Sequence, residues 1–363
     1  MAQLVAVAAL LVASLSADAA LLGQLKAVQD DPKAARRVVR MRQAETAALL
    51  DGLLEQFDQS IHSARTRPEQ RRVEYDAATL QLGIKISRVY ADVTRDTRRW
   101  RQFRAREMRI EGTKYLNDRR YSVALSKLEA ALREAEALND VWLMVITRLN
   151  LAYARLELGN GALARDLCAR AAQDATALGP RAKGLAAFDL ASAYIHLGEF
   201  AASIPYAEAA VRYSREAHIK LWEGNALLNL GIAYRQIGEL DTAESRLDEA
   251  LAVITRTSDQ LGTGRALYDL ALVSIDRRSY AKAAAYLERA LPFIERVDLR
   301  HSHEIELDPK RYYNRIDEDA LRLLVHAYTE LHDATKTASY QAALDALLRA
   351  KPRAAEPRHT HGN

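Results

Sequence analysis

A pattern of small and large apolar positions recurs along this chain about every 40 residues. One copy begins with Asn229-Leu-Gly-Ile-Ala-Tyr234 and continues with Gly238, Ala243, Leu247 and Ala250. An earlier copy begins with Asp189-Leu-Ala-Ser-Ala-Tyr194 and continues with Gly198, Ser203 and Ala210. Small residues let two helices approach closely, and a fixed period of this length is typical of stacked helical hairpins. The pattern therefore predicts an array in which each hairpin packs against its neighbours.

The same register extends from residue 105 to residue 348, which predicts about six hairpins. Some copies lack the glycine that ends the first helix in others, and the residues in its place are Arg119, Arg278 and His332. An insertion interrupts the period near 297–317, and it is either a functional loop or a slack connector. Residues 349–363 are polar and contain proline, so we expect a disordered tail there.

The region before the repeats, residues 20–104, is also expected to be helical. Apolar residues of 32–66 follow helical spacing and predict one amphipathic helix that starts at Pro32. Between Thr79 and Ser87, apolar residues alternate strictly, as in a half-buried strand. Because the surrounding sequence is helical, we predict a helix there, with a strand as the alternative.

Composition changes this picture little. Of the 363 residues, 49% are hydrophobic and 28% are charged, as in an ordinary folded protein. The net charge of +4, from 52 basic and 48 acidic residues, is too small to indicate a nucleic-acid partner by itself. The single cysteine, Cys168, excludes an intrachain disulfide and falls at a core position of its repeat, so we expect an inert buried thiol.

The start of the chain resembles a secretory signal. Leu4 to Leu15 is an uncharged apolar run, and Ala17-Asp18-Ala19 provides small residues for cleavage after Ala19. Residues 1–19 are therefore interpreted as a signal peptide, which predicts a periplasmic or secreted protein. No Lys or Arg precedes the run, so an apolar first helix in a cytoplasmic protein is the alternative. The run is too short to span a bilayer, and no later segment is apolar enough to do so.

The repeats resemble the tetratricopeptide repeat family, in its longer-period form. The matching pattern is a large apolar residue, a small residue, an aromatic, a glycine, and then alanine, a large residue and alanine; it covers about 105–348. The resemblance implies an all-α, right-handed superhelical solenoid, here with a helical N-terminal extension. It also implies a non-catalytic protein that binds a peptide or protein segment in a concave groove.

A row of polar residues occupies one equivalent position in four successive repeats. The polar row consists of Asn150, Asp189, Asn229 and Asp269. Their side chains can accept hydrogen bonds, and asparagine can also donate them. In families with this longer repeat, an asparagine at this position often lines the concave groove, and the resemblance implies that the polar row holds a ligand backbone. The alternative is that these residues only cap or link neighbouring helices.

Further polar residues lie near the polar row on the same first helices. They would read ligand side chains or a terminal carboxylate, although each alone is more often a solvated surface residue. The candidates are Tyr153, Ser192, His196, Asn225, Arg235, Gln236, Arg265 and Asp276. Arg265 precedes Asp269 by one helical turn and therefore shares its face.

The segment Arg95–Arg109 carries seven arginines and two acids, with Trp100 and Phe103 between them. A basic stretch with aromatics can bind an anionic surface, and Arg98, Arg99, Arg101 and Arg104 are the candidate contacts. The alternative is a helix that buries its apolar stripe and turns its arginines to water. A nucleic-acid partner is not expected.

Signals of catalysis, cofactors or metal binding are weak or missing. The sequence contains no glycine-rich phosphate loop, nucleophile elbow or paired-histidine helix. The closely spaced histidines fall in loops, and zinc sites usually need three or four fixed ligands; these residues are His301, His303, His359 and His361. We therefore expect no enzyme, no metal and no cofactor.

These observations together predict a scaffold for protein–protein interactions, working as an adaptor or assembly factor of the cell envelope. Two alternatives remain open: a regulatory sensor that acts through a separate partner protein, and a binder of anionic surfaces through Arg95–Arg109. The ligand, the pathway and the oligomeric state do not follow from the sequence.

Overall fold

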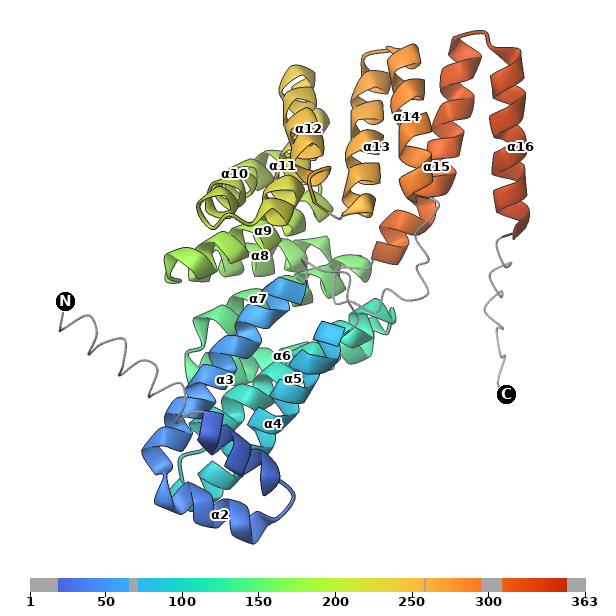
Figure 1. Ribbon diagram of the computed structural model, residues 1–363. Coiled ribbons are helices and arrows are strands. Elements are labelled where there is room, and N and C mark those ends of the chain that lie inside the picture. The colour runs from blue at the N-terminus through green and yellow to red at the C-terminus, as the bar shows by residue number, and fades with distance from the viewer. Residues whose placement is uncertain (1–18, 65–70, 258, 295–308, 351–363) are drawn as a thin grey trace, which may run out of the picture. The chain divides into compact units, whose positions relative to one another are not determined.

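The computed structural model describes residues 19–64, 71–257, 259–294 and 309–350, and within these ranges every regular element is a helix (Figure 1). The prediction of an all-α protein is therefore confirmed. The chain divides into two compact units, residues 1–189 and residues 190–363, and each unit is described by itself.

Unit 1 contains the N-terminal helices and the first repeats. After a short helix over residues 19–27, its helices are α2 (Pro32–Met41), α3 (Gln43–Ala64), α4 (Arg71–Thr94), α5 (Arg98–Asn117), α6 (Tyr121–Leu138), α7 (Val141–Glu157) and α8 (Gly161–Ala175). The division between the units falls inside α9 (Pro180–His196).

Unit 2 continues with paired helices that follow one another along the chain. They are α10 (Phe200–Glu216), α11 (Lys220–Gln236), α12 (Leu240–Ile254), α13 (Gln260–Asp276), α14 (Tyr280–Ile294), α15 (Pro309–Glu330) and α16 (Ala334–Ala350). Neighbouring helices such as α11 and α12, or α13 and α14, pack directly against each other. These helical hairpins have the architecture that the repeat pattern predicts.

The prediction of one helix over 32–66 is wrong, because two helices meet at Arg42. Arg42 leaves the helical region with φ −134° and ψ 49°. Its backbone N–H still donates to the carbonyl of Val38 at 3.1 Å, and its own carbonyl accepts from Thr46 Oγ1 at 2.7 Å. No glycine or proline marks this break, so no local sequence signal predicts it. Residues 65 and 66 lie outside the described residues.

The ambiguous segment between Thr79 and Ser87 is helical, as predicted, and lies inside α4. Its alternating apolar residues have a simple explanation. In a helix, residues two apart point to nearly opposite sides, and α4 packs against α2, α3 and α5. Several sides of α4 are therefore buried, which gives an alternating pattern without a strand.

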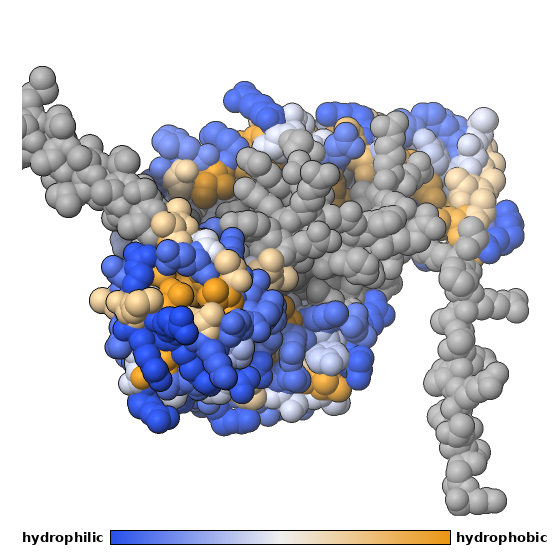
Figure 2. All heavy atoms as spheres, turned by 60° about the horizontal axis from the view of Figure 1, so that its bottom comes forward, coloured by the Kyte–Doolittle hydropathy of each residue, from blue (hydrophilic) through white to orange (hydrophobic). Residues whose placement is uncertain are grey.

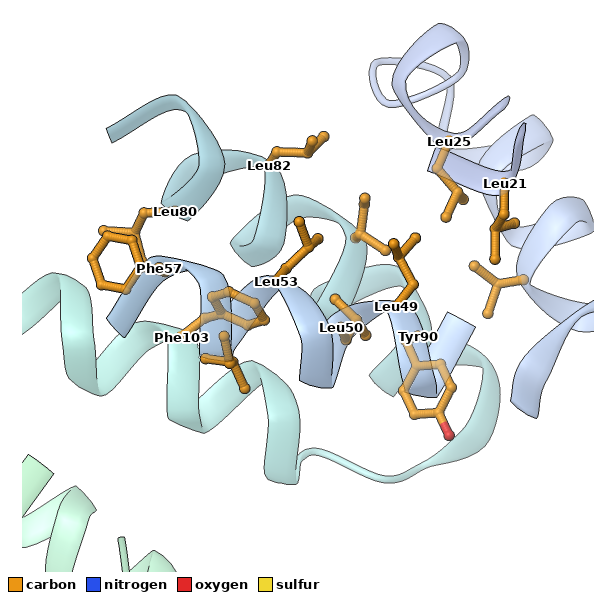
Figure 3. Close-up of a cluster of buried hydrophobic side chains, with 13 residues drawn as sticks. Leu21, Leu25, Leu49, Leu50, Leu53, Phe57, Leu80, Leu82, Tyr90 and Phe103 are labelled. Atoms are coloured by element: carbon orange, nitrogen blue, oxygen red, sulfur yellow. The ribbon is translucent and has the colours of Figure 1, made fainter. Parts of the chain in front are cut away.

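The N-terminal helices enclose a cluster of large apolar side chains (Figure 3). Phe57 of α3 and Phe103 of α5 are 1% and 0% exposed. Leucines and aromatics make up most of the cluster, whose buried members are Leu21, Leu25, Val39, Leu49, Leu50, Leu53, Leu54, Phe57, Leu80, Leu82, Ile86, Tyr90 and Phe103. Large side chains thus fill the space between the helices of this region, which we call the N-terminal cluster.

Helix α5 belongs to the N-terminal region and to the first repeat at once. Near its start, Phe103 completes the N-terminal cluster. Towards its end, Gly112 lies so close to α6 that a Cβ atom there would be 2.6 Å from Leu128 Cγ. The predicted domain boundary at residues 104–105 therefore falls inside one continuous helix.

The repeats bury small residues where two helices of a hairpin meet. A Cβ atom on Gly231 of α11 would lie 2.4 Å from Leu247 Cγ of α12. On α12, Ala243, Leu247 and Ala250 are fully buried along the contact. The small and large residues that define the repeat pattern in the sequence thus lie at the contact between the two helices of a hairpin, which we call the seam.

Turns between the two helices of a hairpin use one backbone conformation throughout. Gly159, Gly198 and Gly238 have positive φ values of 78°, 74° and 87°. Where glycine is replaced, the conformation is kept: Arg119, Arg278 and His332 have φ values of 59°, 58° and 55°. The turn is therefore set by the packing of the hairpin, since these side chains rarely adopt positive φ by themselves.

Within unit 1, Arg106 joins the N-terminal helices to the second repeat. This side chain is only 5% exposed and pairs with Asp58 of α3 at 2.6 Å and with Asp140 at 2.8 Å. Asp140 also accepts the Leu143 backbone N–H at 3.1 Å and so caps the start of α7. One buried guanidinium therefore fixes α3, α5 and α7 to one another.

The remaining predictions concern segments with little or no described structure. Residues 1–18, 295–308 and 351–363 lie outside the described residues. The proposed signal segment, much of the insertion near 297–317 and most of the predicted tail fall there. Among the described helices, none has both the length and the hydropathy that a membrane crossing requires.

Candidate functional site

The polar row lies on the first helices of successive hairpins, as the repeat register predicts. Asn150 on α7 and Asp189 on α9 belong to unit 1, whereas Asn229 on α11 and Asp269 on α13 belong to unit 2. Their burial differs: Asn150 and Asp189 are half-buried, and Asn229 and Asp269 are 4% and 2% exposed. The four positions are therefore equivalent in sequence but not in their access to solvent.

The two asparagines make the same contact. Asn150 Nδ2 donates to Thr113 Oγ1 on α5 at 3.0 Å, and Asn229 Nδ2 donates to Ser192 Oγ on α9 at 3.1 Å. In both cases the hydroxyl lies 37 residues earlier, on the first helix of the preceding hairpin. Part of the hydrogen-bonding capacity of each amide thus links successive first helices, as the alternative interpretation of the polar row expected.

Asp269 lacks this contact, and the sequence explains why. The residue 37 positions before it is Ile232, which has no hydroxyl to offer. Arg265 Nε on the same helix is 3.9 Å from Asp269 Oδ2, which is longer than a hydrogen bond. Among the described residues, Asp269 Oδ2 has no hydrogen-bond partner. Asp269 is therefore a buried carboxylate with an oxygen left unsatisfied, which is a costly arrangement in a folded protein.

The electrostatics of Asp269 reflect this burial. Loss of solvation raises the pKa of Asp269 to about 6, and the charges of Arg265 and Arg235 only partly oppose the rise. At neutral pH the carboxylate is mostly ionised, close to two guanidinium groups. A ligand N–H that reached Oδ2 would supply the missing donor.

The residues around the polar row in unit 2 form contacts of their own. Arg235 on α11 pairs with Asp276 on α13 at 2.6 Å, and His196 Nδ1 is 2.7 Å from the Ser192 carbonyl oxygen. Asn225 is half-buried and Gln236 is exposed. Two flanking candidates thus contact the polar row: Ser192 accepts a hydrogen bond from Asn229, and Arg265 forms a long ion pair with Asp269.

In unit 1, Tyr153 lies one turn after Asn150 on α7 and is 8% exposed. Asp189 is half-buried near the end of the unit. These two residues and Asn150 form a smaller set, described separately from the residues of unit 2.

The four arginines proposed for an anionic surface each have an acceptor. Arg98 donates to the Leu138 carbonyl at 3.2 Å, Arg99 pairs with Asp51 at 2.8 Å, Arg101 pairs with Glu134 at 2.8 Å, and Arg104 pairs with Glu107. The acids come mostly from α3 and α6, far away in the sequence. These ion pairs favour the structural interpretation of Arg95–Arg109 over an anion-binding role.

Glu223 on α11 is a buried charge that sequence reasoning missed. It is 4% exposed and accepts hydrogen bonds from Arg215 Nε at 2.9 Å and Lys220 Nζ at 2.7 Å. Burial acts to raise the pKa of Glu223, but the two cations outweigh it and the pKa is lowered. The spacing of Lys220 and Glu223 was a weak signal, whereas Arg215 comes from the preceding helix. These contacts tie α10 to α11.

Metal-binding and nucleophilic chemistry find little support in the described residues. No group of three or more His, Cys, Asp or Glu side chains there is placed to hold a metal ion. His301, His303, His359 and His361 lie outside the described residues. Cys168 is buried, as expected, and burial raises the pKa of its thiol to about 12, so it is an unreactive thiol.

Comparison with known sequences gives two matches to a repeat family. Residues 186–216 and residues 222–296 each match a profile of the tetratricopeptide repeat. A comparison with curated proteins found no match. The matched ranges include Asp189, Asn229 and Asp269, so three members of the polar row lie in recognised repeats.

Solved structures provide two informative likenesses. The crystal structure of BtubC (BKLC) from P. vanneervenii has a TM-score of 0.51 and 19% identity, over 64% of this chain and 95% of that chain. The crystal structure of PilW, described as a widely conserved type IV pilus biogenesis factor, has a TM-score of 0.50 and 18% identity, over 68% of this chain and 94% of that chain. At these identities the likenesses show the fold alone.

Proposed function

Residues 186–216 and 222–296 are tetratricopeptide repeats, and from this we propose that the chain is a non-catalytic scaffold that binds an extended peptide or protein segment. Repeat arrays bury a continuous core and leave an extended surface of first helices, which suits a ligand that lies along it. The repeats point to protein partners.

The proposed contact surface in unit 2 is the side of α11 and α13 that carries the polar row. The observation that carries the proposal is the unsatisfied oxygen of Asp269 at this position. A backbone N–H or a basic side chain of the ligand would satisfy it, provided that local movement of the chain exposes this buried oxygen. The hydrogen bond between Asn229 and Ser192 supports this surface, and Arg265 and Asn225 flank the proposed contact. In unit 1, Asn150, Tyr153 and Asp189 are proposed as a separate, weaker set.

We also propose that the protein works in the cell envelope, as an adaptor or assembly factor. The support is the apolar run Leu4–Leu15 followed by Ala17-Asp18-Ala19, which resembles a cleaved secretory signal. N-terminal sequencing of protein recovered from cells tests this point. A chain that starts at Ala20 supports export, and a chain that still starts at Met1 or Ala2 contradicts it.

A phage-displayed library of random peptides tests the binding function. We expect the wild type to enrich peptides that bind in solution, and Asp269→Asn combined with Arg265→Gln to weaken the best peptide about 10-fold or more, since a charge-assisted contact is lost. The matched control is Arg246→Gln with Glu249→Gln, which removes the ion pair between these two residues of the second helix α12 and also the pair of Glu249 with Arg215 of α10. That control is expected to bind as the wild type does.

Two results would contradict the proposal. One is equal loss of binding in the α13 variant and the α12 control, which would place the ligand elsewhere or indicate general damage. The other is a wild type that enriches no peptide. A regulatory sensor acting through a partner protein remains the second candidate, and the first-helix surface would then bind that partner.

A further inference from the structure

Helix α2 carries an excess of positive charge. Its ten residues include Lys33, Arg36, Arg37 and Arg40 and no acid. Asp31 precedes the helix, and its side chain caps it by accepting the Lys33 and Ala34 backbone N–H groups. The acid nearest in sequence is therefore already engaged at the helix start.

Three cations on or next to α2 have ion-pair partners among the described residues, and three others do not. Arg36 pairs with Asp92, Lys85 pairs with Asp30, and Arg42 pairs with Glu45. Lys33, Arg37 and Arg40 are exposed, and none has an ion-pair partner in the part of the chain that the structure describes. The three cations are thus solvated and available.

The three free cations share one side of α2. Lys33, Arg37 and Arg40 are spaced four and three residues apart, which places them on a single helical face. Met41, one turn after Arg37, is 71% exposed and extends this face with an apolar group. Ala35 and Val39 are buried on the inner side, so the protein core orients the basic face outwards. Figure 2, which brings the α2 side of unit 1 forward, shows hydrophilic residues around a small group of hydrophobic ones.

The contrast with α5 shows that this is not a general property of the basic helices. Two arginines of α5 are paired with acids of α3 and α6, whereas Lys33, Arg37 and Arg40 of α2 have no ion-pair partner among the described residues. The net charge of +4 does not reveal this difference, because it counts paired and unpaired cations alike.

We propose that the face of Lys33, Arg37, Arg40 and Met41 binds the anionic headgroup surface of a lipid membrane. Cations on a helix face are attracted to anionic lipid, and an exposed apolar side chain among them can enter the headgroup region. Nucleic acid is the weaker candidate, because the phosphate backbone gives an exposed methionine nothing to bury against. The assignment concerns unit 1 and is independent of peptide binding by the repeats.

Vesicle co-sedimentation of the full chain tests the proposal. The vesicles are phosphatidylcholine alone and phosphatidylcholine mixed with phosphatidylglycerol, at low ionic strength. We expect Lys33→Gln, Arg37→Gln and Arg40→Gln together to lower affinity for the anionic vesicles about 100-fold, because each cation contributes about fivefold. Binding to the neutral vesicles is expected to be the same for the wild type and the variant. Any contribution of the apolar run Leu4–Leu15 is included in it, because both chains contain this run.

A matched variant removes the same charge from α5, through Arg98→Gln, Arg101→Gln and Arg104→Gln. We expect it to keep wild-type affinity within about threefold, and Met41→Gln to lose several-fold on the anionic vesicles only. Thermal melting confirms that each variant is folded. Wild-type affinity in the α2 variant, an equal loss in the α5 variant, or binding to a DNA duplex without binding to anionic vesicles would overturn the proposal.

Discussion

The N-terminal cluster and the seams of the repeats are both buried and largely apolar, but they differ in the size of their side chains. Large side chains dominate the N-terminal cluster, whereas glycine and alanine are frequent in the seams. In the N-terminal cluster, Phe57, Phe103 and leucines of α3 and α4 fill the space between helices. In the hairpin of α11 and α12, Gly231 admits Leu247, and alanines line the rest of the contact. The N-terminal region depends mainly on the volume that it buries, although a Cβ atom on Gly83 of α4 would lie 2.2 Å from Phe103 Cε1, and the seams depend mainly on the closeness of their helices.

This difference predicts opposite sensitivities. A region filled by large side chains is damaged when volume is removed, because a cavity remains. A seam of small residues is destabilised when a larger side chain is introduced, because the closely packed neighbouring side chains can shift only at a cost in free energy. Polar side chains are buried in both regions, such as Asn229 and Asp269 in the repeats and Arg106 of α5, which pairs with Asp58 of α3.

The largest expected effect is in the N-terminal cluster. Phe103→Ala should lower the free energy of unfolding of unit 1 by about 3–5 kcal/mol, since a fully buried phenyl ring leaves a cavity. Urea unfolding followed by circular dichroism measures the change. Met41→Ala is the control, because its side chain is 71% exposed and its loss should change stability by less than about 0.5 kcal/mol. A Phe103 variant as stable as this control would show that the cluster does not depend on volume.

The next effect concerns the buried charge on α13. Asp269 has a folded-state pKa of about 6, above the value of about 3.9 expected in the unfolded chain. The folded state therefore binds this proton more tightly, and Asp269 should add stability as the pH falls from about 6 to about 4, by up to about 3 kcal/mol. Above pH 6 its full cost is present.

Asp269→Asn isolates this contribution, because other groups titrate equally in both chains. The difference in unfolding free energy between variant and wild type should favour the variant at pH 8 and shrink towards pH 4. Urea unfolding at several pH values measures it. A difference that does not change with pH would mean that the carboxyl group has an ordinary pKa.

The smallest of these effects is on the seam. Gly231→Val should lower the free energy of unfolding of unit 2 by about 2 kcal/mol, because even a Cβ atom there would lie 2.4 Å from Leu247. Gly161→Val is the matched control, since no atom lies within 4 Å of a Cβ atom at that position. Thermal melting compares the two. Equal melting temperatures would indicate that the seam tolerates added volume and that the comparison of the two regions fails.

Local periodicity explains which parts of the fold were predictable. The small residues of the repeats recur at fixed spacing, so the register, the hairpins and the equivalence of the polar row could all be read from the chain. The break at Arg42 could not, because no glycine or proline marks it. The positive φ of Arg278 was hidden for a similar reason, since the hairpin imposes a conformation that the residue type does not favour.

Contacts between residues far apart in the sequence determine the features of the candidate site that could not be predicted. The sequence shows that Asn229 and Asp269 occupy equivalent positions of their repeats. Whether each side chain finds a hydrogen-bond partner depends on the residue 37 positions earlier, which is Ser192 for Asn229 and Ile232 for Asp269. Likewise, the charge of α5 was visible, whereas its neutralisation by Asp51 and Glu134 required the fold. A count of charges along the sequence thus does not distinguish paired from unpaired arginines.

The contacts of Arg106 have a consequence for how such a chain can change in evolution. Its two carboxylates lie on either side of the first hairpin, with Asp58 before α5 and Asp140 after α6. Because Arg106 itself lies on α5, deleting that hairpin would remove the guanidinium and leave both carboxylates without it. Duplicating the hairpin would leave each copy of Arg106 next to only one of the two carboxylates, and a broken buried ion pair costs about 3–5 kcal/mol. Gene-level gain or loss of repeats is therefore expected further along the chain, with the first hairpin kept as a fixed founding copy.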